Sequence, residues 1–236
     1  MERGERTPVD REKFSEIAVI ASKMAHDLRN PLGVINIAAY NLKKRIGEND
    51  ETAMKRIAVI MQKTAEANGI ITDILSYYRL DPPDKKETDL NSLMEETVSS
   101  MNGLFEAKKI NVTRHEGDLP PVEIDRAQIS KVMQNVIRNA CEAIADDGGN
   151  ISLISRCDEE GKNVEAVITD SGSGMTEEDV TRSGEPFFST KKGRTGMGLA
   201  VSFRIVEENH NGMIVIKSKE GEGTEVTIKL PTGGDN

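Results

Sequence analysis

The sequence predicts a two-domain α+β protein. We expect an N-terminal helical hairpin that forms a dimeric four-helix bundle, and a C-terminal α/β sandwich with helices on one face of a mixed sheet. Apolar residues recur at alternating spacings of three and four from residue 14 to residue 78, whereas strand-like and helix-like segments alternate beyond residue 88. A charged stretch with two prolines separates these regions. The expected boundaries are a hairpin over 1–80, a linker over 81–88 and a sandwich over 89–236.

The hairpin prediction depends on two heptad seams of apolar or small residues. The first seam comprises Phe14, Ile17, Ala21, Met24, Leu28, Pro31, Ile35, Ala38 and Leu42. After a polar break at 47–50, the second seam comprises Ile57, Ile60, Thr64, Ala67, Ile71, Ile74 and Tyr78. Two helices joined by such a short loop pack antiparallel. A lone hairpin would leave much of each seam exposed to water, so we expect a homodimer.

The linker is predicted from Pro82 and Pro83, because proline lacks the amide donor of a helix and clashes one turn back. Beyond the linker, periodicity and turn residues predict a mixed order of elements. The expected helices cover 90–108, 125–145 and 199–208. Asp125 is the expected N-cap of the second of these helices. The expected strands cover 110–114, 151–156, 164–169, 213–218 and 225–230.

Charge and composition exclude several classes of function. The formal net charge is -9, so binding to nucleic acid or to an anionic membrane would require a basic patch. Lys43, Lys44 and Arg45 are too few to form one. Cys141 and Cys157 lack metal-ligand spacing, which fits a reducing compartment. No segment approaches the roughly 20 apolar residues of a membrane-spanning helix and the N-terminus is charged, so we expect a cytoplasmic chain without direct membrane insertion.

His26 lies on the first predicted helix, in the string HDLRNP. The seam positions place His26 on the opposite, exposed face of that helix. Asp27 follows His26 directly and can reach the imidazole from the side, and Asn30, four residues on, shares the helical face of His26. Pro31 removes a backbone hydrogen bond and is expected to bend the helix there. Taken alone, this pattern also fits a surface histidine with no chemical role.

The second predicted helix of the sandwich places Asn135, Asn139 and Glu142 on a face separate from its apolar stripe. Amide oxygens are suitable hard ligands for Mg²⁺, which needs few protein ligands when phosphates and waters supply the rest. A polar stripe that only faces solvent is the alternative. The pattern therefore marks Asn139 as a candidate metal ligand without requiring that role.

The next candidate residues follow the strand that ends near residue 169. The carboxylate of Asp170 can accept a hydrogen bond from the exocyclic amine of a flat ligand. Gly172 and Gly174 allow the backbone to approach such a ligand closely. An ordinary turn is the alternative for this string.

A glycine-rich stretch with basic residues precedes the last predicted helix. Its glycines are Gly193, Gly196 and Gly198, and their free amides next to a positive helix end can hold phosphates. The charge comes from Lys191, Lys192 and Arg194. The stretch is not a Walker loop because GxxxxGK[ST] is absent. On its own it also fits a flexible surface loop.

The string HDLRNPLG resembles the phosphoacceptor motif of histidine kinases, in which an acidic residue follows the histidine and Asn-Pro comes soon after. The resemblance implies that His26 takes the γ-phosphoryl group of ATP. It implies that Asp27 accepts or orients the imidazole proton and that Asn30 positions water for the reverse, phosphatase reaction. These roles agree with the chemistry, because a neutral imidazole nitrogen is nucleophilic and an adjacent carboxylate stabilises developing positive charge.

Further strings resemble the ATP-binding domain of histidine kinases, within the superfamily of gyrase, the ninety-kilodalton heat-shock chaperone and the MutL proteins. QNVIRNACEAI resembles the asparagine box, whose residue matching Asn139 coordinates magnesium. DSGSGM resembles the first glycine loop, whose residue matching Asp170 recognises the adenine amino group. PFFSTK and GRTGMGLAV resemble the phenylalanine box and the second glycine box, which includes Leu199. GEGTEVTIKLP resembles the closing strand, with Thr224 in the matching place.

Two positions depart from related patterns. Many histidine kinases have a lysine where this chain has Glu142, so Arg138 becomes the candidate for that phosphate contact. Asn135 stands where the chaperone and gyrase branch uses a general-base glutamate, which disfavours simple ATP hydrolysis. The predicted nucleotide site comprises Asn135, Arg138, Asn139, Asp170, Gly172, Gly174, Lys191, Arg194, Gly196, Gly198, Leu199 and Thr224.

The resemblance covers about residues 12–231 and implies the core of a sensor histidine kinase that uses ATP and Mg²⁺. The ATP-binding domain would swing on the linker to present the γ-phosphate to His26. The phosphoryl group would then pass to an aspartate on the receiver domain of a separate response regulator. A sensor domain is expected outside this chain or on a partner, and a membrane-anchored sensor would have this chain as its cytoplasmic portion. The alternatives are a superfamily ATPase that drives conformational change and a catalytically inactive dimeric scaffold.

Overall fold

The structure is a computed structural model that describes the backbone over 8–46, 50–191 and 194–233, with side chains from residue 21 onward. The chain forms two compact units, Met1–Asp81 and Pro82–Asn236. Each unit contains one of the two element patterns predicted from the sequence.

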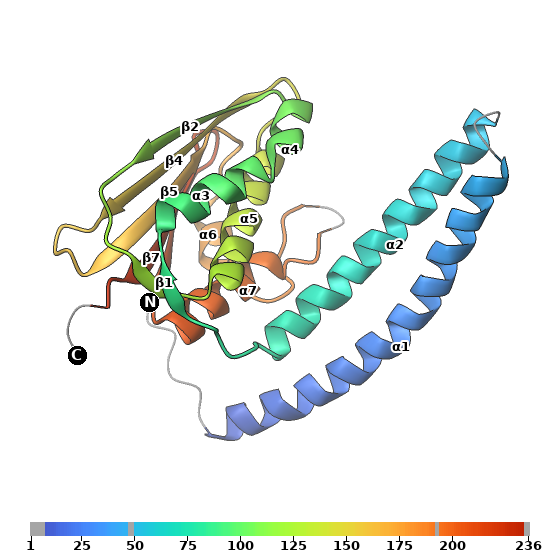
Figure 1. Cartoon of the computed structure of the whole chain (residues 1–236), viewed down its shortest axis with the longest axis horizontal. Coiled ribbons are helices and arrows are strands. Elements are labelled where there is room, and N and C mark those ends of the chain that lie inside the picture. The colour runs from blue at the N-terminus through green and yellow to red at the C-terminus, as the bar shows by residue number, and fades with distance from the viewer. Residues whose placement is uncertain (1–7, 47–49, 192–193, 234–236) are drawn as a thin grey trace. The chain divides into compact units, whose positions relative to one another are not determined.

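The N-terminal unit is a hairpin of α1 (Pro8–Ile46) and α2 (Glu51–Tyr78), as the heptad spacing predicts (Figure 1). The carboxylate of Asp50 caps α2 by accepting a hydrogen bond from the backbone N–H three residues on, at 2.9 Å. α1 continues through Pro31 and curves along its length. No helix of the described residues is long and apolar enough to span a membrane.

The buried residues of α1 differ from the predicted first seam. From residue 21 onward, where the side chains of α1 are described, the buried ones are Ala25 and Ala39. The buried residues of α2, Ile57, Thr64 and Ile71, belong to the predicted second seam. The predicted first-seam residues Met24, Leu28, Ile35 and Leu42 are between 45% and 58% exposed. A bundle helix has an apolar stripe wide enough for two neighbours, and only one edge of that stripe is covered within a single hairpin. The break at 47–49 and the side chains of Phe14 and Ile17 lie outside the described residues.

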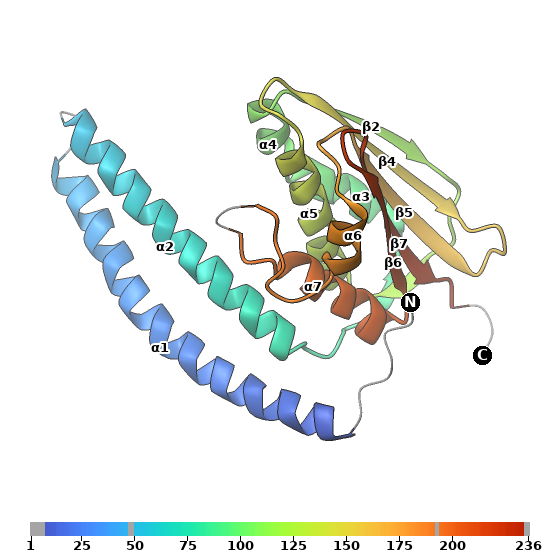
Figure 2. The same ribbon diagram turned by 180° about the vertical axis from the view of Figure 1, so that it is seen from behind.

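The C-terminal unit is built on a five-stranded sheet with the order β2-β4-β5-β7-β6. The strands are β2 (Ile110–Glu116), β4 (Gly149–Cys157), β5 (Asn163–Asp170), β6 (Met213–Lys219) and β7 (Gly223–Pro231). β2 and β4 run parallel, and every other neighbouring pair is antiparallel. Helices cover one face of this sheet (Figures 1 and 2), so the predicted mixed sheet with helices on one face is confirmed.

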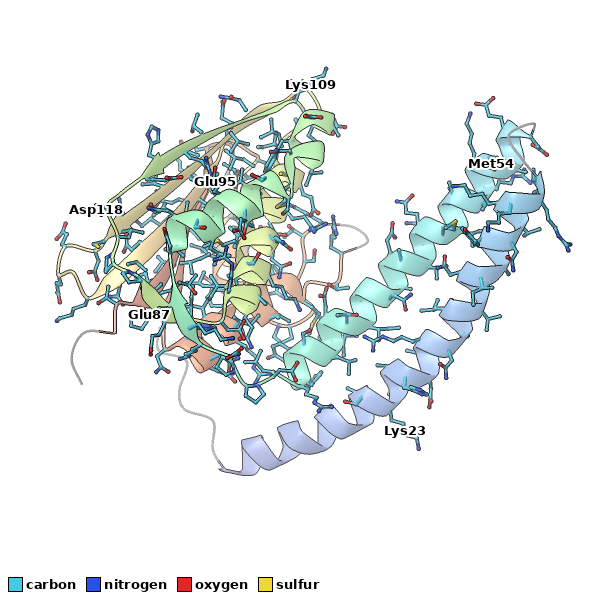
Figure 3. The ribbon with its side chains drawn as sticks, viewed as in Figure 1. Lys23, Met54, Glu87, Glu95, Lys109 and Asp118 are labelled. Carbon is cyan, nitrogen blue, oxygen red and sulfur yellow. The ribbon has the colours of Figure 1, made fainter. Side chains whose placement is uncertain are left out.

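The helical layer differs from the prediction mainly at element ends. Its members are α3 (Leu90–Ser99), α4 (Asn102–Ala107), α5 (Arg126–Ala143), α6 (Glu177–Arg182), α7 (Gly198–Arg204) and the π-helix η2 (Ile205–Asn209). The single helix expected over 90–108 is wrong, because the helix ends at Ser99 and a new one begins at Asn102. Lys109, labelled in Figure 3, has a φ of 53° where the chain turns from α4 into β2. α6 was not predicted.

Part of the expected linker belongs to the C-terminal unit. β1 (Lys86–Thr88) pairs antiparallel with β3 (Val122–Ile124), two short strands that local periodicity did not reveal. Just before β1, the backbone N–H of Asp84 donates to Oδ2 of Asp125 at 2.9 Å. The segment expected to be linker over 81–88 is therefore anchored from residue 84 onward.

The core lies between the helices and the sheet. Most of the largest fully buried side chains come from α3, α5 and the central strands, namely Leu90, Leu93, Met94, Ile129, Met133, Ile137, Ile151, Leu153, Ile168 and Ile228. Burying each of them stabilises the fold by about 1.5–3 kcal/mol. The apolar stripe of α5 is thereby fixed against the sheet, which turns its polar face away from the core.

Hydrogen bonds around Asp125 and His210 fix the start of α5. Oδ1 of Asp125 accepts from the backbone N–H of Gln128 at 3.0 Å, which confirms the predicted N-cap. The backbone N–H of Asp125 donates to Nε2 of the buried His210 at 3.0 Å. Nδ1 of His210 lies 2.8 Å from the carbonyl oxygen of Ile205, so the neutral imidazole donates there and accepts from Asp125. Burial lowers the pKa of His210 below its ordinary value of 6.5.

This arrangement predicts acid sensitivity of the C-terminal unit. Below about pH 6.5 the imidazole of His210 binds a proton in the unfolded chain but stays neutral in the folded chain. The free energy of unfolding therefore decreases as the pH falls, by at most about 1.4 kcal/mol per pH unit. We expect His210→Gln to reduce this pH dependence in urea unfolding experiments. His115→Gln, which removes an exposed histidine from β2, should retain it. Equal pH dependence in wild type and His210→Gln would contradict this account.

Candidate functional site

His26 lies on the exposed surface of α1, as predicted. The side chains of His26 and Asp27 are 76% and 66% exposed, and Nδ1 of the imidazole lies 3.5 Å from Oδ1 of Asp27. This distance is at the outer limit of a hydrogen bond. Asn30 is exposed one turn on. The structure therefore places the three predicted catalytic residues on one accessible stretch of α1.

Arg29 was not predicted as a site residue. Its Nη2 donates to Oγ1 of Thr72 on α2 at 3.0 Å. Thr72 in turn donates to the carbonyl oxygen of Asn68, one turn earlier in α2. Arg29 thus ties the helical turn that follows His26 to the second helix, a contact across the hairpin that no local pattern could indicate.

The polar face of α5 meets α7 and the segment before it. Nδ2 of Asn135 donates to the carbonyl oxygen of Gly198 at 3.3 Å and lies 3.4 Å from Oγ of Ser202. Asn135 therefore positions α7 against α5. Asn139 and Glu142 follow along the same helix and are partly buried. The predicted grouping of these three side chains on one face of α5 agrees with the structure.

Asp170 ends β5 as a buried carboxylate. Its Oδ1 accepts from the backbone N–H of Gly172 at 2.8 Å. Burial raises its pKa above the ordinary value, although hydrogen bonds from Gly172 and Thr224 and the charge of Lys191 oppose the shift. Such a carboxylate is a strong acceptor in a low-dielectric site.

Thr224 is the cross-strand partner of Asp170 in the register of β5 and β7. Oγ1 of Thr224 lies 2.9 Å from Oγ of Ser218 on β6. Gly223, which was not predicted, has a φ of 95°, and a Cβ there would collide with the carbonyl oxygen of Asp170. The closing strand therefore contributes Thr224 to the site and needs glycine beside it for close backbone packing.

Gly172 and Gly174 have structural roles in addition to the predicted approach to a ligand. A Cβ on Gly172 would lie 2.6 Å from Cβ of Ala143, at the end of α5. Gly174 has a φ of 66°, and a Cβ there would collide with the carbonyl oxygen of Lys219. Both glycines thus allow the loop after β5 to pack against other protein backbone, which a string of glycines alone does not reveal.

The basic segment contacts the polar face of α5. Nζ of Lys191 donates to the carbonyl oxygen of Asn139 at 3.1 Å and lies 3.7 Å from Oε2 of Glu142. Arg194 forms an ion pair with Oε1 of Glu142. Burial lowers the pKa of Lys191, and the positive charge of Lys108 adds to this, whereas the negative charge of Asp170 opposes it. The predicted Lys192 and Gly193 lie outside the described residues.

The remaining predicted residues lie at different places around this segment. Gly196 has a φ of 67°, and a Cβ there would collide with the carbonyl oxygen of Phe188. Gly198 and Leu199 begin α7, where Leu199 is partly buried. Arg138 is exposed, and none of the described hydrogen bonds or ion pairs joins it to Asn139, Glu142 or Lys191. Glu142 itself, not predicted as a site residue, is the centre of the ion pairs.

Together these residues form a partly buried polar site between α5, the ends of β5 and β7, and the segment before α7. It combines a buried acceptor at Asp170, an amide at Asn139 and the cations of Lys191 and Arg194. Such a set can bind a ligand that has an amine at one end and phosphates at the other. Among the described residues there is no group of three or more His, Cys, Asp or Glu side chains that could hold a metal by itself.

Comparisons with protein families match both units. Residues 124–234 match the family "Histidine kinase-, DNA gyrase B-, and HSP90-like ATPase". Residues 19–83 match the "His Kinase A (phospho-acceptor) domain". The matches include His26 in the first unit, and Asn139 and Asp170 in the second.

Individual relatives agree with these matches. Sporulation kinase B of Bacillus subtilis (strain 168) is 33% identical over 226 residues, which are 93% of this chain and 51% of the relative, so the chain spans about half of that protein. Histidine kinase ThkA, solved in complex with response regulator protein TrrA, has a TM-score of 0.67 and 25% identity, with 94% of this chain and 64% of that chain covered. Full-length ShkA, solved with AMPPNP, shares the fold with a TM-score of 0.77 at 19% identity, over 89% of this chain and 45% of that chain.

Two glycines of the site are expected to differ sharply in their tolerance of a methyl group. Gly174→Ala would have a positive φ and a collision with the carbonyl oxygen of Lys219, so we expect the free energy of unfolding to fall by about 2 kcal/mol or more. In Gly198→Ala the added Cβ would lie 3.7 Å from the nearest side-chain atom, Cγ of Asn135, and the change should stay within about 0.5 kcal/mol. Urea denaturation measures both values. Equal destabilisation would refute the assigned role of Gly174.

Proposed function

The chain has the two-domain core of sensor histidine kinases, and on that premise we propose that it transfers the γ-phosphoryl group of ATP to His26. The phosphoryl group then passes to an aspartate of a response regulator. The observation that supports this most directly is the exposed imidazole of His26, inside the phospho-acceptor match and beside Asp27.

The chemistry at His26 follows from the neighbouring carboxylate. With its proton on Nδ1 facing Asp27, the neutral imidazole presents the lone pair of Nε2 to solvent. Nε2 attacks the γ-phosphorus, the bond from that phosphorus to the oxygen of ADP breaks, and ADP leaves. Asp27 stabilises the positive charge that develops on the ring. In the next step a receiver aspartate attacks the phosphorus and the phosphorus–nitrogen bond breaks, which regenerates the imidazole.

ATP recognition is assigned to the site on the C-terminal unit. Asp170 accepts a hydrogen bond from the adenine amino group, and Lys191, Arg194 and the amides around Gly196 and Gly198 face the phosphates. Mg²⁺, when bound, neutralises phosphate charge and fixes the phosphate geometry. One amide oxygen at Asn139 suits this ion, which takes most of its ligands from phosphates and waters. Because Asp84 is anchored to Asp125, the swing of this unit would occur within 79–83.

Partners and the reverse reaction complete the proposal. The exposed first-seam residues of α1 leave an apolar stripe that a second copy of the hairpin covers, which makes the protein a homodimer. The acceptor is the receiver domain of a separate response regulator, and the ThkA complex with a response regulator supports this choice. Asn30, exposed one turn after His26, positions water for phosphatase activity toward that regulator.

Labelling with γ-labelled ATP and Mg²⁺ tests the phosphoryl transfer. We expect acid-labile, alkali-stable label on the wild-type chain, which is the signature of phosphohistidine. His26→Gln should lose essentially all label, because the nucleophilic nitrogen is gone. His115→Gln, which removes another exposed histidine, should be labelled like the wild type.

The same experiment distinguishes the alternatives. Free phosphate without protein label would favour an ATPase, and neither product would favour an inactive scaffold. Label that persists on His26→Gln would exclude this residue as the acceptor.

Dimerisation through the first seam is tested by adding one charge at two similarly exposed positions of α1. Ile35→Asp places a carboxylate within the predicted interface, so we expect the mass in solution to fall toward that of one 25.9 kDa chain. Tyr40→Asp adds the same charge on the face of His26 and should remain dimeric. Light scattering at matched concentrations measures both masses. A dimeric Ile35→Asp would argue for a different interface.

A further inference from the structure

Glu142 is placed to interact with the cations of the nucleotide site. It lies three residues after Asn139 on α5, so both side chains share one face of the helix. Its side chain is only 18% exposed, unusual for a glutamate, which stays buried only when it is paired. Both of its carboxylate oxygens have cationic partners in the segment before α7.

The two partners bind different oxygens of Glu142. Arg194 pairs with Oε1, and Nζ of Lys191 lies 3.7 Å from Oε2. Lys191 is further fixed by its 3.1 Å hydrogen bond to the carbonyl oxygen of Asn139. The carboxylate of Glu142 therefore holds both cations beside the helical turn that carries Asn139, the candidate magnesium ligand.

We propose that Glu142 sets the affinity of this protein for nucleoside triphosphates by competing with the phosphates for Lys191 and Arg194. The inference rests on the proposed binding of ATP to this site. A phosphate oxygen and a carboxylate oxygen attract the same two side chains, and each cation can satisfy only a limited number of strong acceptors. ATP must therefore replace Glu142 as the partner of Lys191 and Arg194. A nucleoside without phosphates can bind while both cations stay paired with Glu142.

Removing the carboxylate charge should strengthen ATP binding. Glu142→Gln keeps the size of the side chain and one acceptor oxygen, but weakens both pairings. Because the pairs are partly exposed and individually modest, we expect the Kd for ATP to fall roughly threefold to tenfold. The Kd for adenosine should not change, because adenosine does not require either cation.

The measurement is calorimetric titration of the full chain with ATP and with adenosine, each with Mg²⁺ and again with a chelator. The matched control is Glu95→Gln on α3, labelled in Figure 3, which removes the same charge from an ion pair with Arg114 at 3.3 Å. This control should bind both ligands like the wild type. Tighter binding of ATP by Glu142→Gln, in both the presence and the absence of Mg²⁺, supports the proposal.

A double-mutant cycle separates competition from plain repulsion between Glu142 and the phosphates. In the Arg194→Gln background, competition predicts that Glu142→Gln improves ATP binding by a clearly smaller factor than in the wild type. An equally large improvement in that background would mean repulsion alone and would overturn the proposal. Weaker ATP binding by Glu142→Gln, confined to solutions with Mg²⁺, would instead identify Glu142 as a metal ligand and would also overturn it.

Failure of this inference is distinguishable from failure of the proposed function. If wild type binds ATP and Glu142→Gln binds it equally well, only the competition is excluded. If the wild type binds neither ATP nor adenosine, the proposed function and this inference fall together.

Discussion

The packing of α5 determines the geometry of the C-terminal unit, because this helix has one face in the core and the other at the site. Ile129, Met133 and Ile137 are buried against the rest of the core, so α5 cannot rotate without exposing them to water. Its N-terminus is held by Asp125, which forms hydrogen bonds with the backbone of Asp84 and with the imidazole of His210. Polar groups farther along the helix are therefore presented from a rigid support.

The two units offer opposite environments for their functional groups. The imidazole of His26 is open to solvent, as the proposed attack on the phosphate of ATP requires. Asp170 is buried, which suits recognition, because a hydrogen bond in a low-dielectric surrounding discriminates strongly between a donor and an acceptor.

Local patterns predicted the elements that bury a continuous apolar stripe. α5 and the strands β4 to β7 lie close to their expected positions, and Asp125 caps α5. The features that local patterns did not predict involve partners that are distant in the sequence. β1 pairs with β3, and the ion pair between Glu142 and Arg194 joins residues 52 positions apart. Within one hairpin α1 buries Ala25 and Ala39, whereas the predicted first seam stays exposed, because periodicity does not reveal which edge of a wide apolar stripe meets which neighbour. At the candidate site, residue types were predictable, but the backbone contacts that require glycine were not.

Two alanines that α1 buries within its described side chains make the hairpin sensitive to small changes in volume. Ala25 and Ala39 present only methyl groups to the interior, and helices in contact through such small side chains approach closely. A bulkier residue at position 25 would push α1 outward directly beside the imidazole at position 26. Buried side chains such as Ala25, which a docking protein would not contact, thus determine the shape of the surface around His26 that such a protein would meet.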